Sequence, residues 1–375
     1  MTLTLESKLD LLRPPTVRFG AGQLADFPAW VAARGHRRPF LVTDGFNGAR
    51  KTALGLGDVP LFDGLRAEPD LAVLEAALAA ARATEPDLVI GFGGGSAMDL
   101  AKLVAVMIGS DLPFSAISGP NRAPPRRVGL AQIPTTAGTG SEVGTRALVT
   151  DPATLNKVAT ESPHMLADIA LIDPALTQSV PPAITAATGV DALAHCVEAF
   201  TSRRAHPLVD AYAREGIGLV GRYLQRAVAD GDDIEARAGL SLAAFYGGVS
   251  LGPVNTTAGH AISYPLGTTF GIAHGVANAL IFPHVLAANA AATPEKTGMI
   301  CAALGLDASD EASILASATA FCAALGLPMR LRDYGVTQAA LPTMASQAHA
   351  IRRLLDYNPR LLSVGDIEAI YHAAY

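Results

Sequence analysis

Cysteine, tryptophan and charge are scarce in this chain of 375 residues. There are three cysteines and one tryptophan, and 17% of the residues are charged. Cys196, Cys301 and Cys322 lack the C-x-x-C spacing of a metal site, which argues against both a zinc–cysteine site and a disulfide framework. We expect free thiols in a reducing cytoplasm.

From the sequence we expect no basic face, no signal peptide and no membrane span. The formal net charge is −6, whereas a nucleic-acid-binding domain is normally basic. Residues 1–8 lack a basic start followed by an apolar run, and apolar segments break well before the ~20 residues that cross a bilayer. Half of the residues are nevertheless apolar, enough for a large core. We expect a cytoplasmic globular enzyme of two domains, with no nucleic-acid or membrane partner.

The pattern of elements changes once along the chain. Up to about residue 178, short apolar strands alternate with helical stretches such as 70–84, which predicts a parallel sheet covered by helices on both faces. The expected strands cover 40–43, 87–91, 129–133 and 169–173. The expected helices beyond residue 178 cover 185–202, 207–229, 233–249, 276–291, 308–325, 338–349 and 364–374. We therefore predict an α/β domain over 1–178 and an all-α domain over 179–375, with a ligand cleft between them.

A glycine-rich loop follows the second expected strand and opens a helix. It reads Gly91-Phe-Gly-Gly-Gly-Ser96-Ala-Met-Asp99-Leu-Ala-Lys102. Glycine permits close approach of the backbone, and a helix N-terminus offers free N–H groups, so a phosphate or pyrophosphate would fit here. The alternative is a tight strand–helix turn without a ligand. The loop is not a Walker A sequence, because no Gly-Lys-Ser/Thr follows.

Two further polar segments stand at expected strand ends. Asp44 could accept hydrogen bonds from an adenosine ribose and would repel a 2′-phosphate, which favours NAD over NADP. Its alternative role is an Asx turn before Gly45. The loop 133–142, Ile-Pro-Thr-Thr-Ala-Gly-Thr-Gly-Ser-Glu, carries four hydroxyls that could hold a ribose or the nicotinamide amide, or could form a plain Ser/Thr turn.

One acidic residue and three histidines in the helical half suit a metal site. Asp191 and His195 are four residues apart, which puts both on one helix face. His260 and His274 lie in apolar, glycine-rich surroundings, where an unpaired imidazole is costly to bury. A carboxylate and three imidazoles form a suitable ligand set for Fe²⁺ or Zn²⁺. For each histidine taken singly, core packing is the alternative.

These segments together resemble the iron-containing (group III) alcohol dehydrogenase family over almost the whole chain. The matching stretches are 93–102, 134–142, 187–195, 260–267 and 273–279, with a similar C-terminal pattern from Asn358 to Tyr371. The resemblance implies a dehydroquinate synthase-like architecture with an N-terminal dinucleotide-binding α/β domain and a helical metal-binding domain. It also implies hydride transfer between NAD(H) and an alcohol or aldehyde, and a homodimer.

The resemblance further implies the site residues. As metal ligands it implies Asp191, His195, His260 and His274. As cofactor-binding residues it implies Asp44, Gly93, Gly94, Gly95, Ser96, Asp99, Thr135, Thr136, Thr139 and Lys157. The Fe²⁺ or Zn²⁺ ion would act as a Lewis acid on the substrate oxygen, so no covalent nucleophile is required.

The substrate side departs from the family pattern. Many members carry histidine where this chain has Tyr264, so a histidine proton relay is excluded there; Tyr264 would donate to the substrate oxygen or only line the pocket. Arg146 stands where relatives often carry asparagine or an aromatic residue, and its guanidinium would suit an anionic group. Its alternative partners are Glu142 and the cofactor phosphates. With Asn255 nearby, we predict a small polar alcohol or aldehyde, and an anionic one as the sharper hypothesis.

Three other functions remain open from the sequence. They are a general short-chain primary alcohol dehydrogenase, a redox-neutral metalloenzyme resembling dehydroquinate synthase, and a catalytically dead metal- and nucleotide-binding assembly protein. The loop 134–142 and the surroundings of His260 and His274 fit the alcohol dehydrogenases better than dehydroquinate synthase. Retention of all four ligand types argues against the dead protein.

Overall fold

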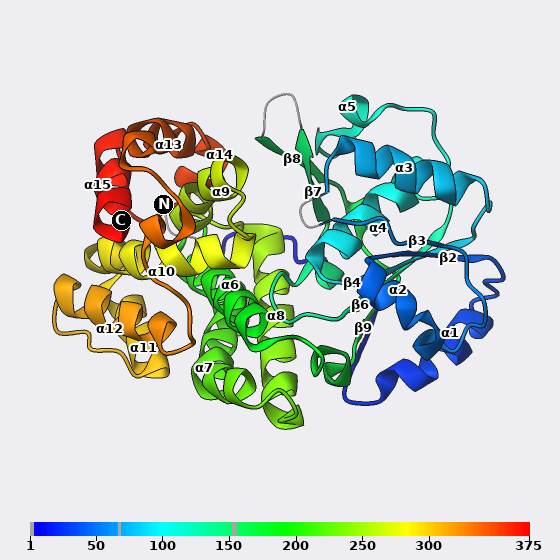
Figure 1. Cartoon of the computed structure of the whole chain (residues 1–375), viewed down its shortest axis with the longest axis horizontal. Coiled ribbons are helices and arrows are strands. Elements are labelled where there is room, and N and C mark those ends of the chain that lie inside the picture. The colour runs from blue at the N-terminus through cyan, green and yellow to red at the C-terminus, as the bar shows by residue number, and fades with distance from the viewer. Residues whose placement is uncertain (1–3, 67–68, 152–155) are drawn as a thin grey trace. The chain divides into compact units, whose positions relative to one another are not determined.

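The chain folds into two compact units, in a computed structural model that describes residues 4–66, 69–151 and 156–375 (Figure 1). The first unit comprises Leu12–Thr136 and Gly140–Ser179. The second comprises Ala137–Thr139, Val180–Tyr375 and the described residues up to Leu11. Residues 4–11 join the second unit because Leu9 packs against its apolar side chains and the Ser7 carbonyl lies 3.3 Å from His206 Nε2.

A six-stranded parallel sheet forms the centre of the first unit (Figure 1). Its strand order is β1-β9-β6-β4-β2-β3, and every pair in it is parallel, as the sequence predicts. The strands are β1 (Thr16–Phe19), β2 (Pro39–Thr43), β3 (Leu61–Phe62), β4 (Leu88–Gly93), β6 (Gly129–Pro134) and β9 (Ile169–Ile172). The helices of the unit are α1 (Phe27–Ala33), α2 (Gly45–Ala49), α3 (Leu71–Arg82), α4 (Gly95–Met107) and α5 (Phe114–Ile117).

Helices cover both faces of this sheet. Because side chains alternate along a strand, Phe40 and Val42 join the core that α3 and α4 share, whereas Leu41 joins a separate core with α1. In that second core, Trp30 of α1 stacks on Phe27 with ring centroids 6.0 Å apart. The predicted doubly covered sheet is therefore confirmed.

A three-stranded sheet in the same unit was not predicted. Its order is β5-β8-β7, with β5 (Gly119–Pro120) parallel and β7 (Arg146–Asp151) antiparallel to β8 (Asn156–Glu161). In β7 only Ala147 and Val149 are fully buried, and the apolar run Ala147–Val149 is flanked by polar residues on both sides. An apolar run of three residues among polar ones is too short to predict a strand.

Only helices follow β9 in the described residues, which confirms the all-α second half. They are α6 (Pro182–Thr201), α7 (Pro207–Ala229), α8 (Ile234–Val254), α9 (Ala258–Phe270), α10 (His274–Asn289), α11 (Pro294–Leu304), α12 (Glu311–Ala323), α13 (Leu341–His349), α14 (Arg352–Leu355) and α15 (Val364–Ala374). The sequence did not predict α9. Its interior Pro265 and its glycines disfavour a helix, but burial of Ile262 and Leu266 in the core outweighs them.

One segment has a longer apolar stretch than the sequence analysis expected. The 19 residues His274–Ala292 would suffice, by length and composition, to cross a membrane. However, 67% of this segment is buried inside the structure, and α10 packs against α6, α9, α12 and α15. We explain its apolar character by this position at the centre of the helical unit.

Candidate functional site

Three neighbouring strands of the large sheet end in the polar loops that the sequence singled out. Because β2, β4 and β6 are adjacent and parallel, their carboxyl ends lie at one edge of the sheet. The Thr135 N–H donates to the Gly93 carbonyl at 2.9 Å. Asn47 Nδ2 donates to Asp44 Oδ2 at 2.6 Å and to Thr135 Oγ1 at 3.4 Å. The structure thus brings the predicted residues Asp44, Gly93 and Thr135 together.

The backbone turns from β4 into α4 without room for side chains. Gly93 has a φ of 155°, and a Cβ there would lie 2.8 Å from Ala97 Cβ. Gly94 is the N-cap of α4 and no side chain caps that end, which leaves backbone N–H groups for an anion. Gly95 and Ser96 form the first turn and are partly exposed. A phosphate is the ligand that this geometry suits best.

Asp44 also has a local structural role. Its Oδ1 accepts a hydrogen bond from the Asn47 N–H at 2.9 Å and so caps α2, which is the Asx-type geometry of the alternative interpretation. A Cβ on Gly93 would lie 3.4 Å from Asp44 Oδ2, so the carboxylate borders the glycine loop. Carboxylate oxygens have several acceptor positions, and capping leaves some of them for a ribose.

Asp99, predicted as a cofactor-binding residue, is engaged inside its own unit. Its Oδ1 accepts from Ser141 Oγ at 2.5 Å and its Oδ2 from the Leu148 N–H at 2.9 Å. The buried Lys102 donates to Ser141 Oγ at 2.6 Å and to the Arg146 carbonyl at 2.8 Å, and burial lowers the pKa of this lysine. Asp99 thus holds α4 against β7 and the loop after β6, and its contact with the cofactor stays a prediction.

The other predicted cofactor residues are spread over both units. Thr136 Oγ1 lies 3.3 Å from the position of a Cβ on Gly94, beside the glycine loop. Lys157 lies on β8 opposite Thr150 of β7. Thr139 belongs to the short segment Ala137–Thr139 that groups with the helical unit.

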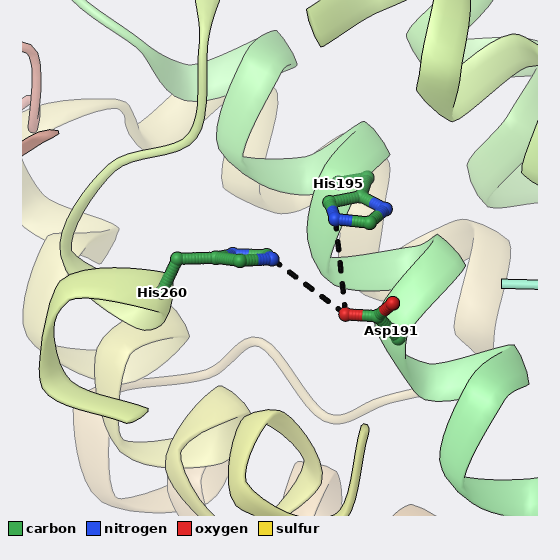
Figure 2. A group of neighbouring side chains, drawn as sticks. All are labelled: Asp191, His195 and His260. Atoms are coloured by element: carbon green, nitrogen blue, oxygen red, sulfur yellow. Dashed lines mark ion pairs between the residues drawn. The ribbon is translucent and has the colours of Figure 1, made fainter. Parts of the chain in front are cut away.

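Three of the four predicted metal ligands, Asp191, His195 and His260, form one cluster in the helical unit (Figure 2), and His274 also approaches Asp191. Asp191 and His195 extend from successive turns of α6, and His260 reaches them from α9. The Nε2 atoms of His195, His260 and His274 lie 3.7, 3.6 and 3.6 Å from the same atom, Asp191 Oδ1. His274 is the first residue of α10. Three of the four side chains are buried, and His274 is 24% exposed.

This donor set fits a divalent transition-metal ion. Bonds of 2.0–2.2 Å to a tetrahedral ion put neighbouring ligand atoms roughly 3.3–3.6 Å apart, close to the distances measured here. Neutral imidazoles and a carboxylate suit both Fe²⁺ and Zn²⁺. Asp191, His195, His260 and His274 would hold the ion.

The site carries negative charge that favours a cation. Burial opposes ionisation of Asp191, but the surrounding histidines hold the pKa of its carboxyl well below its usual range. Burial lowers the pKa of His195. It opposes protonation of His260 too, but the Glu198 and Asp191 carboxylates outweigh it and raise the pKa of that imidazole to about 10.

Sequence reasoning missed two polar residues that contact these ligands. Glu198 Oε1 lies 2.6 Å from His260 Nδ1. Asn278 Nδ2 donates to Asp191 Oδ1 at 2.6 Å, while its Oδ1 accepts from Ser263 Oγ at 2.5 Å. Glu198 was detectable, since it follows Asp191 by seven residues and so lies on the same helix face. Asn278 was detectable in the same way, since it follows His274 by four residues and so lies on the same face of α10.

Arg146 has an ion-pair partner that the sequence did not indicate. Its Nε and Nη2 donate to Glu161 Oε2 at 3.2 and 2.8 Å. Arg146 and Glu161 are directly opposite in the β7–β8 pair, which was itself unpredicted. The expected alternative partner was Glu142, so that assignment is corrected to Glu161.

The two other predicted substrate residues lie in the helical unit. Asn255 ends α8 with a φ of 74°, which is rare for a residue other than glycine, and its Oδ1 accepts from the Thr256 N–H at 2.9 Å. The Tyr264 ring lies 5.8 Å from the His274 ring and 6.4 Å from the His260 ring, centroid to centroid. Tyr264 therefore borders the ligand cluster.

Comparison with known proteins gives the same family over both units. The family description "Iron-containing alcohol dehydrogenase" matches residues 14–174, and "Fe-containing alcohol dehydrogenase family, C-terminal" matches residues 185–375. Long-chain-alcohol dehydrogenase 1 of Geobacillus thermodenitrificans is 37% identical, over 96% of this chain and 95% of that protein. A 1,3-propanediol dehydrogenase of Klebsiella pneumoniae is 33% identical, over 98% of each.

Solved structures agree with this result. A 1,3-propanediol oxidoreductase superposes with a TM-score of 0.92 at 31% identity, over 98% of this chain and 100% of that one. Sulfoacetaldehyde reductase from Bifidobacterium kashiwanohense, solved in complex with NAD⁺, superposes with a TM-score of 0.89 at 28% identity, over 98% of this chain and 99% of that one. The chain belongs to the iron-containing alcohol dehydrogenase family.

Proposed function

We propose that this enzyme transfers hydride between NAD(H) and a small polar alcohol or aldehyde, with Fe²⁺ or Zn²⁺ held by Asp191, His195, His260 and His274. The observation that carries the proposal is the convergence of three imidazole Nε2 atoms on one buried carboxylate oxygen. We further propose that the first unit is the dinucleotide-binding domain and the second the metal-binding domain. A cytoplasmic homodimer is the expected form.

Each part of the chain has a distinct task in this proposal. The bound ion supplies a Lewis acid that polarises a hydroxyl or carbonyl oxygen. The N-terminus of α4, at Gly94, Gly95 and Ser96, binds the pyrophosphate, and Asp44 accepts from the ribose hydroxyls. Thr135, Thr136, Thr139 and Lys157 contact the remainder of the cofactor. Tyr264 borders the ligands from α9 and limits the space for the substrate.

The experiment is NADH consumption by the metal-loaded enzyme with a panel of aldehydes, followed by absorbance. We expect stoichiometric oxidation of NADH, loss of turnover after chelation, and recovery with Fe²⁺ or Zn²⁺. A redox-neutral metalloenzyme or a dead assembly protein would consume no NADH with any aldehyde, and that outcome would refute the proposal. Elemental analysis of anaerobically purified protein identifies the metal.

The charge of the substrate is tested through the Arg146–Glu161 pair. Sulfoacetaldehyde, succinate semialdehyde and phosphonoacetaldehyde are compared with butanal. If Arg146 binds the anion, Arg146→Ala lowers kcat/KM for the anionic aldehydes only, by the roughly 2–5 kcal/mol of a truncated charge pair. The matched variant Glu161→Gln removes the charge of the Glu161 carboxylate beside Arg146 and is expected to raise kcat/KM for the same substrates. Equal effects on butanal favour a general short-chain alcohol dehydrogenase.

A further inference from the structure

The two oxygens of Glu198 join α6 to the first turn of α9. Oε1 lies 2.6 Å from His260 Nδ1, and Oε2 accepts from Thr257 Oγ1 at 3.0 Å and from the His260 N–H at 3.4 Å. The Thr257 N–H also donates to Oε2. The Glu198 carboxylate is buried and none of these partners belongs to its own helix.

Glu198 acts as the N-terminal cap of α9. Thr257 occupies the N-cap position, yet its side chain makes no capping bond. The first-turn N–H groups of a helix need acceptors, and a negative charge beside them is favourable. Glu198 supplies both from a neighbouring helix, and the N–H of His260 is one of the groups that it satisfies.

Gly259 allows this close approach. A Cβ at Gly259 would lie 2.6 Å from Glu198 Oε1 and 3.1 Å from its Cδ. A side chain at this position would therefore displace the carboxylate from His260. The Glu198 carboxylate of α6 therefore packs directly against the backbone of α9 at Gly259.

The bond to Oε1 also fixes which nitrogen of His260 faces the metal site. A carboxylate can only accept, so Nδ1 carries a hydrogen, and Nε2, 3.6 Å from Asp191 Oδ1, is the nitrogen that would give its lone pair to a bound ion. His195 differs, since its Nδ1 lies 3.3 Å from the neutral carbonyl of Gly138. A carboxylate partner makes an imidazole a stronger electron donor to a metal than a carbonyl does.

We infer that Glu198 is a positioning residue that makes His260 the anchoring ligand of the metal centre. This inference rests on the proposed metal site. Glu198 sets the backbone of the turn that carries His260, holds its ring in one orientation and fixes its tautomer. It acts through His260 and touches neither substrate nor cofactor.

The test is the affinity of Glu198→Gln for Zn²⁺, measured by chelator competition. Glutamine keeps the volume, which matters because Glu198 lines a cavity of ≈ 20 Å³ that truncation to alanine would enlarge. We expect Zn²⁺ to bind roughly 10–100-fold more weakly, the usual cost of losing such a partner. We also expect an altered absorption spectrum of the Co²⁺ form and unchanged NADH binding. The matched control is Asp210→Asn on α7, which removes the acidic partner of Lys296 on α11 and is expected to leave the Zn²⁺ affinity unchanged.

Three outcomes would overturn the inference. The first is a folded Glu198→Gln variant that binds Zn²⁺ with the affinity of the wild type. Glu198 would then be only a helix cap, even if the thermal stability of the variant is lower. If Glu198→Gln does not fold, the variant to measure is Glu198→Asp, whose shorter side chain moves the carboxylate away from His260 Nδ1 by the length of one methylene group. The second outcome against the inference is a wild-type Zn²⁺ affinity in Glu198→Asp. The third is an Asp191→Asn variant that binds Zn²⁺ as tightly as the wild type does, which would refute the proposed metal centre itself.

Discussion

Single carboxylates in this chain combine a structural role with a proposed functional one. Asp44 caps α2 and borders the glycine loop, and Glu198 caps α9 and holds a metal-ligand histidine. A substitution at either residue therefore changes two properties at once. Variants that keep a hydrogen-bond acceptor but remove the charge distinguish the structural role of the side chain from its proposed functional role.

Asp44→Asn is expected to weaken the preference for NAD(H) over NADP(H). Asparagine Oδ1 can still accept from the Asn47 N–H, so the cap survives, whereas repulsion of a 2′-phosphate disappears. The ratio of kcat/KM values should move toward NADP(H) by roughly tenfold, or about 1.4 kcal/mol. Asp44→Gly would also lose the cap and is the less specific variant. Equal efficiency of the wild type with both cofactors contradicts the role of Asp44.

His284 of α10 is expected to make the protein acid-sensitive. Burial lowers the pKa of its imidazole to about 4, against about 6.5 in an unfolded chain. The folded state therefore excludes a proton that the unfolded state binds, so stability is complete above about pH 6.5 and falls as the pH decreases toward 4. The loss amounts to about 3 kcal/mol at pH 4.

The measurement is the free energy of unfolding in urea between pH 7.5 and pH 4. His284→Gln should flatten this pH dependence. The exposed His372, changed to glutamine, is the matched control and should leave the slope as it is. An unchanged slope in His284→Gln would show that other groups cause the acid sensitivity.

At the scale of elements, glycine sets how closely α7 approaches its neighbours. A Cβ on Gly221 would lie 2.2 Å from the backbone oxygen of Ala303 in α11. Gly218, one turn earlier on the same helix, has no neighbouring atom within 4 Å of such a Cβ. One glycine is therefore required by packing and the other is not.

Gly221→Ala and Gly218→Ala are expected to change stability in opposite directions. The first must push α11 away and should cost roughly 1–3 kcal/mol of unfolding free energy. The second adds a better helix former without a clash and should gain up to about 1 kcal/mol. Urea unfolding of both variants checks this pair, and a loss of stability in both would contradict the packing argument.

The elements that the sequence could predict are those with strong local signals. Examples are the glycine loop, the apolar strands and the i, i+4 pair of Asp191 and His195. Each of these patterns is formed by residues close together in the sequence. By contrast, α9 contains residues that disfavour helices and forms because its apolar face is buried. The pairing of Arg146 with Glu161 depends on a small sheet whose apolar runs are too short to be detected. Spacing along α6 and α10 could have indicated Glu198 and Asn278, but their contacts with His260 are tertiary, so no local pattern shows them.

At the scale of the whole molecule, the two proposed binding functions lie in different units. The four proposed metal ligands belong to the helical unit, and the glycine loop belongs to the α/β unit. Each unit has its own apolar core. A defect in the ligand set should therefore leave the fold of the other unit intact.

His260→Ala and Asp191→Asn are expected to lose the metal and turnover while still binding NADH. Removal of the Lewis acid should lower kcat by roughly a thousandfold or more, since it supplies several kcal/mol to the reaction. Elemental analysis, turnover and NADH titration are measured on the same preparations. Normal turnover by metal-free His260→Ala would refute the mechanism.

The stacking of Trp30 on Phe27 has a spectroscopic consequence. Trp30 is the single tryptophan and lies in the α/β unit, whereas all eight tyrosines, from Tyr212 onward, lie in the helical unit. Selective excitation of tryptophan thus reports on the α/β unit, and its emission overlaps the absorbance of NADH, so energy transfer should register nucleotide binding. The near-ultraviolet circular dichroism of tyrosine should respond to metal release. Each unit carries its own optical label, and the two can be followed separately in one sample without an added dye.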